Sequence, residues 1–145
     1  MRDFLLSVVS ALAMSGEAAA PPAADAYRPV PAADDALYRA FGGAEAVQET
    51  VLAFERIALA DPRIAHTFEE SDMNRFREKL TLQLCWLMGG PCVYDGFGMR
   101  ESHQPLDIGP AEWGAMVEDF QMAMSEAGVP FRTQNKLLKI LAPMR

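Results

Sequence analysis

Two glycine pairs divide this chain into short segments, and they constrain its fold more than any other feature. Gly42-Gly43 lies near the start of the patterned region, and Gly89-Gly90 lies in its middle with Pro91 directly after it. Glycine readily ends a helix, and proline cannot continue one. Between these breaks apolar residues recur at spacings of three and four, with no sustained two-residue alternation of the strand type. The sequence therefore predicts an all-α domain with four main helices and two or three short ones.

The clearest helix start lies at residues 71–72. Ser71 is expected to cap the helix, and Asp72 favours its first turn through the helix dipole. A stripe of apolar residues follows at helical spacing: Met73, Phe76, Leu80, Leu84 and Leu87. The Gly89-Gly90-Pro91 run ends this helix.

Three further helices are predicted, over residues 44–60, from 110 to about 127 and from 131 to 141. The first carries its apolar face at Val47, Val51, Phe54 and Ala58. In the second, Trp113 and Phe120 are seven residues apart and so share a face, and we assign both to the core.

Charge and histidine content exclude several functions. The net charge of −7 argues against a nucleic-acid partner, which needs a basic surface, and leaves no polybasic membrane anchor. The chain has only two histidines, His66 and His103, so a metal site built from several histidines is excluded. A metal centre here must bring most of its own ligands, as a porphyrin does.

The N-terminal region differs from the rest. Residues 1–20 combine Arg2, an apolar run too short to span a bilayer, and a small-residue stretch, and we interpret them as a secretory signal. An amphipathic helix is the alternative. Residues 21–33 are rich in alanine and proline and are expected to form a linker, so the domain proper covers 34–145. The mature protein is then expected in the periplasm without a membrane span, or in the cytoplasm if residues 1–20 are retained.

Short motifs along residues 34–145 occur in a familiar order and spacing. They are LYRAFGG (37–43), ADPRI (60–64), Phe68, Asp72-Met73, GGP (89–91), YDG (94–96), MRESH (99–103) and AGVP (127–130). Together they make this region resemble the group 1 truncated haemoglobins. The resemblance implies a shortened globin fold, in which two antiparallel helix pairs sandwich one haem b.

The resemblance also implies roles for individual residues. His103 matches the proximal ligand of the haem iron, and Phe68 matches the phenylalanine that packs on the porphyrin. Phe76 and Leu80 would form the distal wall, and Lys79 matches a position that often pairs with a haem propionate. The remaining residues expected at the cofactor are Phe54, as part of the apolar lining, and Met99, one turn before His103 on the same face.

Chemistry supports this assignment. Neutral imidazole is a good ligand for haem iron. The second ring nitrogen of His103 would need an acceptor, for which a main-chain carbonyl is suitable. The propionates would need a cation, which Lys79, Arg75 or Arg77 could supply.

The chain departs from the family where a gas ligand is normally held. The usual distal tyrosine follows a phenylalanine, and here that pair is Phe54-Glu55. A polar residue of the distal helix is replaced by Leu80, so the pocket is expected to be largely apolar. Glu55 either leans outward and pairs with Arg56 or Arg63, which we favour, or enters the pocket as a neutral acid.

Two other features stay open. Cys85 and Cys92 could form a disulfide or remain two buried thiols, because spacing does not decide whether their Cα atoms lie within about 7 Å. His66 is expected not to bind iron.

These observations predict a haem protein that reversibly binds oxygen, nitric oxide or carbon monoxide. An alternative is a haem enzyme with nitric-oxide dioxygenase or peroxidase-like activity, for which a separate electron donor would be required because the sequence lacks a GxGxxG nucleotide fingerprint. A haem-free helical interaction module is the third hypothesis, and the presence of His103 and Phe68 argues against it.

Overall fold

The computed structural model describes residues 29–144 and places them in helices joined by short loops. In chain order these are α1 (Ala36–Phe41), α2 (Gly43–Ala60), the 3-10 helix η1 (Ala65–Phe68), α3 (Met73–Leu87), α4 (Met99–His103), η2 (Gln104–Leu106), α5 (Pro110–Glu126), α6 (Phe131–Leu141) and η3 (Ala142–Met144). No strand occurs among these residues, which confirms the all-α prediction. None of the helices within 29–144 is long and apolar enough to span a membrane. The predicted signal segment, and the predicted linker up to residue 28, lie outside the described residues.

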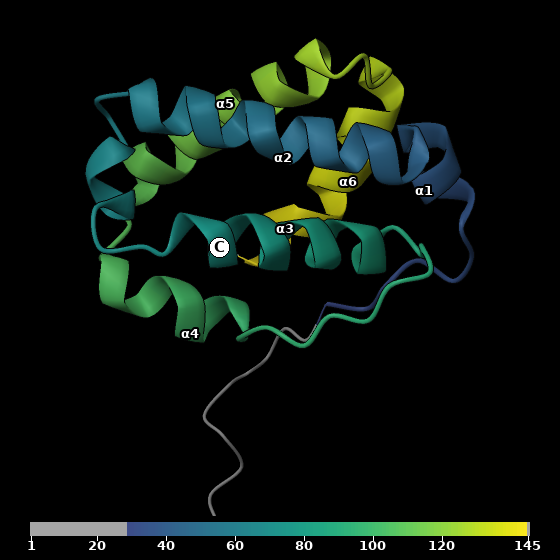
Figure 1. Cartoon of the computed structure of the whole chain (residues 1–145), viewed down its shortest axis with the longest axis horizontal. Coiled ribbons are helices and arrows are strands. Elements are labelled where there is room, and N and C mark those ends of the chain that lie inside the picture. The colour runs from purple at the N-terminus through teal and green to yellow at the C-terminus, as the bar shows by residue number, and fades with distance from the viewer. Residues whose placement is uncertain (1–28, 145) are drawn as a thin grey trace, which may run out of the picture.

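Helix α2 is the centre of the arrangement. It packs against α3 on one side and α5 on the other, while α6 lies against α1 and α5 (Figure 1). The short α4 lies beyond α3 in the same view, away from α2. Helix α4 therefore does not pack against α2. It lies at a cavity that residues of α3 and α5 also line.

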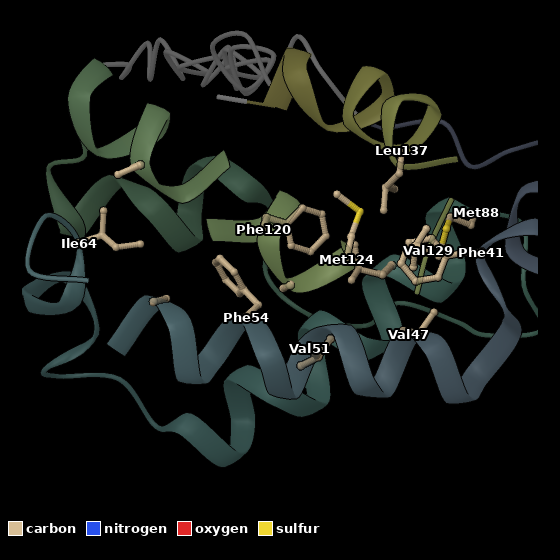
Figure 2. Close-up of a cluster of buried hydrophobic side chains, with 14 residues drawn as sticks. Phe41, Val47, Val51, Phe54, Ile64, Met88, Phe120, Met124, Val129 and Leu137 are labelled. Carbon is tan, nitrogen blue, oxygen red and sulfur yellow. The ribbon is translucent and has the colours of Figure 1, made fainter. Parts of the chain in front are cut away.

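The core forms mainly between α2 and α5. The α2 face predicted from the sequence is buried, with Val47, Val51, Phe54 and Ala58 each at most 5% exposed. Phe54 and Phe120 point toward each other, with ring centroids 5.5 Å apart in an edge-to-face arrangement (Figure 2). Burial of such aromatic side chains contributes a large share of the apolar stabilisation.

The start of α3 corrects one expectation. Asp72, not Ser71, is the N-cap: its side chain accepts hydrogen bonds from the backbone N–H groups of Asn74 at 3.0 Å and Arg75 at 3.1 Å. A cap of this kind contributes about 1 kcal/mol, and the negative charge also suits the positive end of the helix dipole. The helix therefore begins one residue later than the sequence pattern suggested.

The segment before α1, together with the first turn of α1, lies against the end of α3. The backbone N–H of Ala32 donates to the Leu87 carbonyl at 2.9 Å, and that of Tyr38 donates to the Met88 carbonyl at 3.2 Å. Gly89 adopts φ +80°, and a Cβ there would lie 1.9 Å from the carbonyl oxygen of Asp34. Two chain segments can approach this closely only because residue 89 has no side chain.

Arg63, just after α2, joins three carboxylates. Its guanidinium lies 2.8 Å from Asp61, 2.8 Å from Glu118 and 3.9 Å from Asp119. Asp119 is only 2% exposed, and its Oδ2 has no hydrogen-bond partner within residues 29–144. Burial, followed by the neighbouring Asp61, raises the pKa of Asp119 to about 6. Hydrogen bonds from Arg63 lower the pKa of Asp61 to about 2.

Asp119→Asn is expected to stabilise the fold above pH 6 and to change it little near pH 4. A carboxyl group whose pKa rises from 3.8 to about 6 on folding contributes stability below pH 3.8, and this contribution is lost as pH rises through 6. The raised pKa corresponds to at most about 3 kcal/mol at pH 8. Urea unfolding at pH 4 and pH 8 measures the effect.

The matched control is Glu118→Gln, because Glu118 also contacts Arg63 but its side chain is 61% exposed. This variant should change the free energy of unfolding by no more than about 0.5 kcal/mol at either pH. Destabilisation by Asp119→Asn that is larger at pH 8 than at pH 4 would show that the carboxylate is favourable in its charged form, and it would contradict the raised pKa.

Candidate functional site

One cavity of about 1080 Å³ brings together the seven residues that the sequence assigned to the cofactor site. It lies between α3, α4 and α5, with the end of α6 closing one side. The seven residues are Phe54, Phe68, Phe76, Lys79, Leu80, Met99 and His103, and all of them line it. Its volume is slightly above the range of roughly 300–1,000 Å³ that is typical of cofactor and ligand pockets.

One wall of the cavity is aromatic. The Phe76 ring lies 6.2 Å from that of Phe54 and 5.4 Å from that of Phe68, measured between centroids. Leu80 lies one helical turn after Phe76 on the same face of α3. These side chains offer an apolar surface without hydrogen-bond donors.

His103 lies at the end of α4 with its ring in a defined hydrogen-bonded state. Nδ1 lies 2.7 Å from the Met99 carbonyl oxygen. A carbonyl can only accept, so Nδ1 must carry the proton, and in the neutral ring the lone pair is then on Nε2. This arrangement, one ring nitrogen bonded to a main-chain carbonyl and the other available, suits a metal ligand.

The structure corrects the assignment of Trp113 to the core. This residue lines the cavity, and its ring lies 5.2 Å from the His103 ring at an angle of 38°. Phe120, which shares its face of α5, is buried as predicted, and its ring packs against that of Phe54. Helical spacing identifies a shared face but does not separate core from cavity lining, so the sequence could not assign Trp113.

The loop after α3 runs back along that helix at the cavity edge. Lys79 Nζ lies 2.8 Å from Asp95, and the Arg75 guanidinium lies 5.3 Å from the centroid of the Phe97 ring. The hydrogen bond between Lys79 and Asp95 raises the pKa of the lysine and lowers the pKa of the aspartate. Arg75 and Lys79 thus provide two cations in the cavity lining, where an anionic group of a bound cofactor could pair with them.

The same loop is attached to α3 by a disulfide. Cys85 and Cys92 are bonded, with their Cα atoms 5.9 Å apart, which decides between the two alternatives left by the sequence. Trp86 stacks on Tyr94 next to this bridge, with ring centroids 6.1 Å apart. Burial raises the pKa of Tyr94, whose hydroxyl donates to the Phe97 carbonyl at 2.7 Å.

Glu55 pairs with an unexpected partner. It lies 3.0 Å from Arg77 of α3, whereas Arg56 pairs with Glu126 and Arg63 with the carboxylates described above. Glu55 and Arg77 are absent from the cavity lining. The outward interpretation of Glu55 therefore holds with a different arginine, and Arg77 is not at the cavity edge.

Two more residues complete the description. His66 is exposed and does not line the cavity. Gln83 was missed by the sequence analysis: it is 6% exposed, lines the cavity and donates from Nε2 to the Met99 sulfur at 3.2 Å. Its position three residues after Leu80, on the same face of the helix, could have indicated that it lines the cavity.

Known proteins resemble this chain in sequence and in fold. The family model described as "Bacterial-like globin" matches residues 36–145. The group 1 truncated hemoglobin of Tetrahymena pyriformis is 30% identical over 109 residues, covering 75% of this chain and 90% of its own length. The chain belongs to the group 1 truncated haemoglobins. A second member, from Synechocystis sp., is 36% identical over 98 residues, covering 65% of this chain and 79% of its own.

The fold comparison agrees with this membership. The crystal structure of the Fe(III) form of the Tetrahymena pyriformis protein matches with a TM-score of 0.72 and covers 75% of this chain and 93% of that one. This truncated haemoglobin therefore has the two-over-two helical fold that the resemblance implied. Membership of the family implies a haem cofactor with iron and a gaseous ligand.

Proposed function

We propose that this truncated haemoglobin holds haem b through Nε2 of His103 and reversibly binds a diatomic gas. The observation that carries the proposal is the hydrogen bond of His103 inside the cavity: Nδ1 donates to the Met99 carbonyl at 2.7 Å, which in the neutral ring puts the lone pair on Nε2. Bound haem would supply an iron centre to which oxygen, nitric oxide or carbon monoxide could bind.

The rest of the cavity lining suits this cofactor. Phe54, Phe68, Phe76 and Leu80 can pack on a flat macrocycle, and Arg75 or Lys79 can pair with its propionates. Lys79 would have to exchange its contact with Asp95 for such a pairing. A cavity of this size and composition is also a reason to set aside the haem-free interaction module.

The distal wall of the cavity favours reversible gas binding over dioxygenase or peroxidase-like activity. Glu55 is paired with Arg77 outside the cavity, and Phe76 and Leu80 offer no hydrogen bond. Donors preorganised toward developing charge are what accelerate such reactions. We therefore rank dioxygenase or peroxidase-like activity, which would also require an external electron donor, below reversible binding.

Titration of the purified protein with hemin tests the proposal. We expect a Soret band that saturates at one haem per chain, and a further shift when the ferrous form is exposed to carbon monoxide. A protein that stays colourless would contradict haem binding. Stopped-flow mixing of the oxygenated form with nitric oxide then separates the two haem functions, because a dioxygenase would rapidly become ferric while the bound oxygen and the nitric oxide combine to nitrate.

We also propose that the protein is exported. Residues 1–20 have the pattern of a secretory signal, and a disulfide such as Cys85–Cys92 persists in oxidising compartments. The intact mass of the protein isolated from its native cells tests this: an unprocessed N-terminus in the cytoplasmic fraction would contradict it.

A further inference from the structure

Gln83 is a polar residue buried in a largely apolar wall. It follows Leu80 by three positions and Phe76 by seven, so all three lie on the face of α3 that lines the cavity. The residue is 6% exposed. A buried amide without a partner costs free energy, so its hydrogen bond decides what the residue does at this place.

That hydrogen bond crosses from α3 to α4. Nε2 of Gln83 donates to Sδ of Met99 at 3.2 Å. The carbonyl of the same Met99 accepts from Nδ1 of His103 at 2.7 Å. Met99 therefore links the two residues, with its side chain bound to the distal helix and its main chain bound to the histidine ring.

Helix α4 needs such a link because it has little other support. It comprises five residues, Met99–His103, and begins directly after a loop that contains Gly96 and Gly98. A helix of this length is not stable without tertiary contacts. On its other side, the contact between the rings of His103 and Trp113 restrains it.

We propose that Gln83 is a positioning residue for His103 and acts through Met99. The proposal rests on the ligation of haem by His103 proposed above. By fixing the Met99 side chain, Gln83 holds the Met99 carbonyl where it accepts from Nδ1. That acceptor sets the ring orientation and raises the basicity of Nε2, as partners of ligating histidines do in metal sites generally.

The test compares Gln83→Met with the unmodified holoprotein. Methionine is also a long, unbranched side chain, and it removes the donor. We expect the iron–histidine stretching band in the resonance Raman spectrum of the ferrous, ligand-free form to move to lower frequency. We expect haem transfer to excess apomyoglobin to become up to about tenfold faster, the lower end of the effect of losing a partner of a metal ligand.

A double-mutant cycle separates this role from general loss of packing. Met99→Leu keeps the main-chain carbonyl but removes the sulfur acceptor, so it should shift the same band, and adding Gln83→Met should then cause no further shift. Gln121→Met is the matched control, because Gln121 belongs to α5 and does not line the cavity. It should leave the band unchanged.

Two outcomes would overturn the inference. One is an unchanged iron–histidine band in Gln83→Met. The other is an additive shift in the double variant, which would mean that Gln83 acts independently of Met99. Either result leaves haem ligation by His103 intact, whereas failure of the proposed ligation would appear separately, as the absence of an iron–histidine band in the unmodified protein.

Discussion

His103→Ala is expected to release haem from this protein at least about 100-fold faster than the unmodified chain. Loss of a residue that merely supports a metal ligand costs roughly 10- to 100-fold in affinity, so loss of the ligand itself should cost more. The aromatic wall of Phe54, Phe68 and Phe76 can still hold the macrocycle weakly. Transfer to excess apomyoglobin, followed in the Soret region, measures the rate.

Two measurements show whether the loss is specific to the iron bond. Added imidazole should occupy the space left by the side chain and restore part of the spectrum, which general unfolding would prevent. His66→Ala is the control, because His66 is exposed and outside the cavity, and it should retain haem as the parent does. If the His103 variant keeps haem with unchanged spectra, another group is the proximal ligand.

Gly89→Ala is expected to destabilise the fold by at least about 3 kcal/mol and to lower Tm by roughly 10–15 °C. Its backbone has φ +80°, which costs a residue with a side chain about 1–2 kcal/mol. The new Cβ would also lie 1.9 Å from the Asp34 carbonyl oxygen, a backbone atom that cannot rotate away. The segment before α1 would have to move off the end of α3. Thermal unfolding followed by circular dichroism gives the effect.

Two other glycines separate the cost of the positive φ from the cost of the close approach to Asp34. Gly128 has φ +75°, and a Cβ added there would have no neighbouring atom within 4 Å, so Gly128→Ala should show the conformational cost alone, about 1–2 kcal/mol. Gly98 has neither a positive φ nor a close neighbour, so Gly98→Ala should be neutral or stabilising by up to about 1 kcal/mol. Equal effects at 89 and 128 would mean that the close approach to Asp34 carries no cost.

Helix positions and the cavity lining were accessible from the sequence for different reasons. Local rules placed the breaks: Gly42 adopts φ +114° and ends α1, and the Gly89-Gly90-Pro91 run ends α3 as expected. Five of the seven residues expected at the cofactor came from the order and spacing of motifs in a family resemblance, and Phe54 and Met99 came from apolar character and helical spacing. Periodicity identified the buried face of α2, because one stripe of that helix meets α5 along its length.

Errors arose wherever the answer depended on which neighbour a side chain meets. Glu55 pairs with Arg77, not with Arg56 or Arg63, because α3 packs against α2 at that level. Trp113 lines the cavity and lies against the ring of His103, although its helical stripe is continuous with the core. Gln83 gave no strong signal, since a glutamine in a helix usually faces water, and its partner lies 16 residues away in the chain.

The order of residues along the chain was thus enough to establish where helices end, which faces are apolar and which family the protein belongs to. Helix ends and apolar faces depend on neighbours within about one or two helical turns, and the family resemblance depends on the order and spacing of motifs along the chain. The disulfide, the partners of charged side chains and the link from Gln83 to His103 became known from the packing of helices against one another. Such contacts join residues far apart in sequence, and their geometry depends on every helix that lies between them.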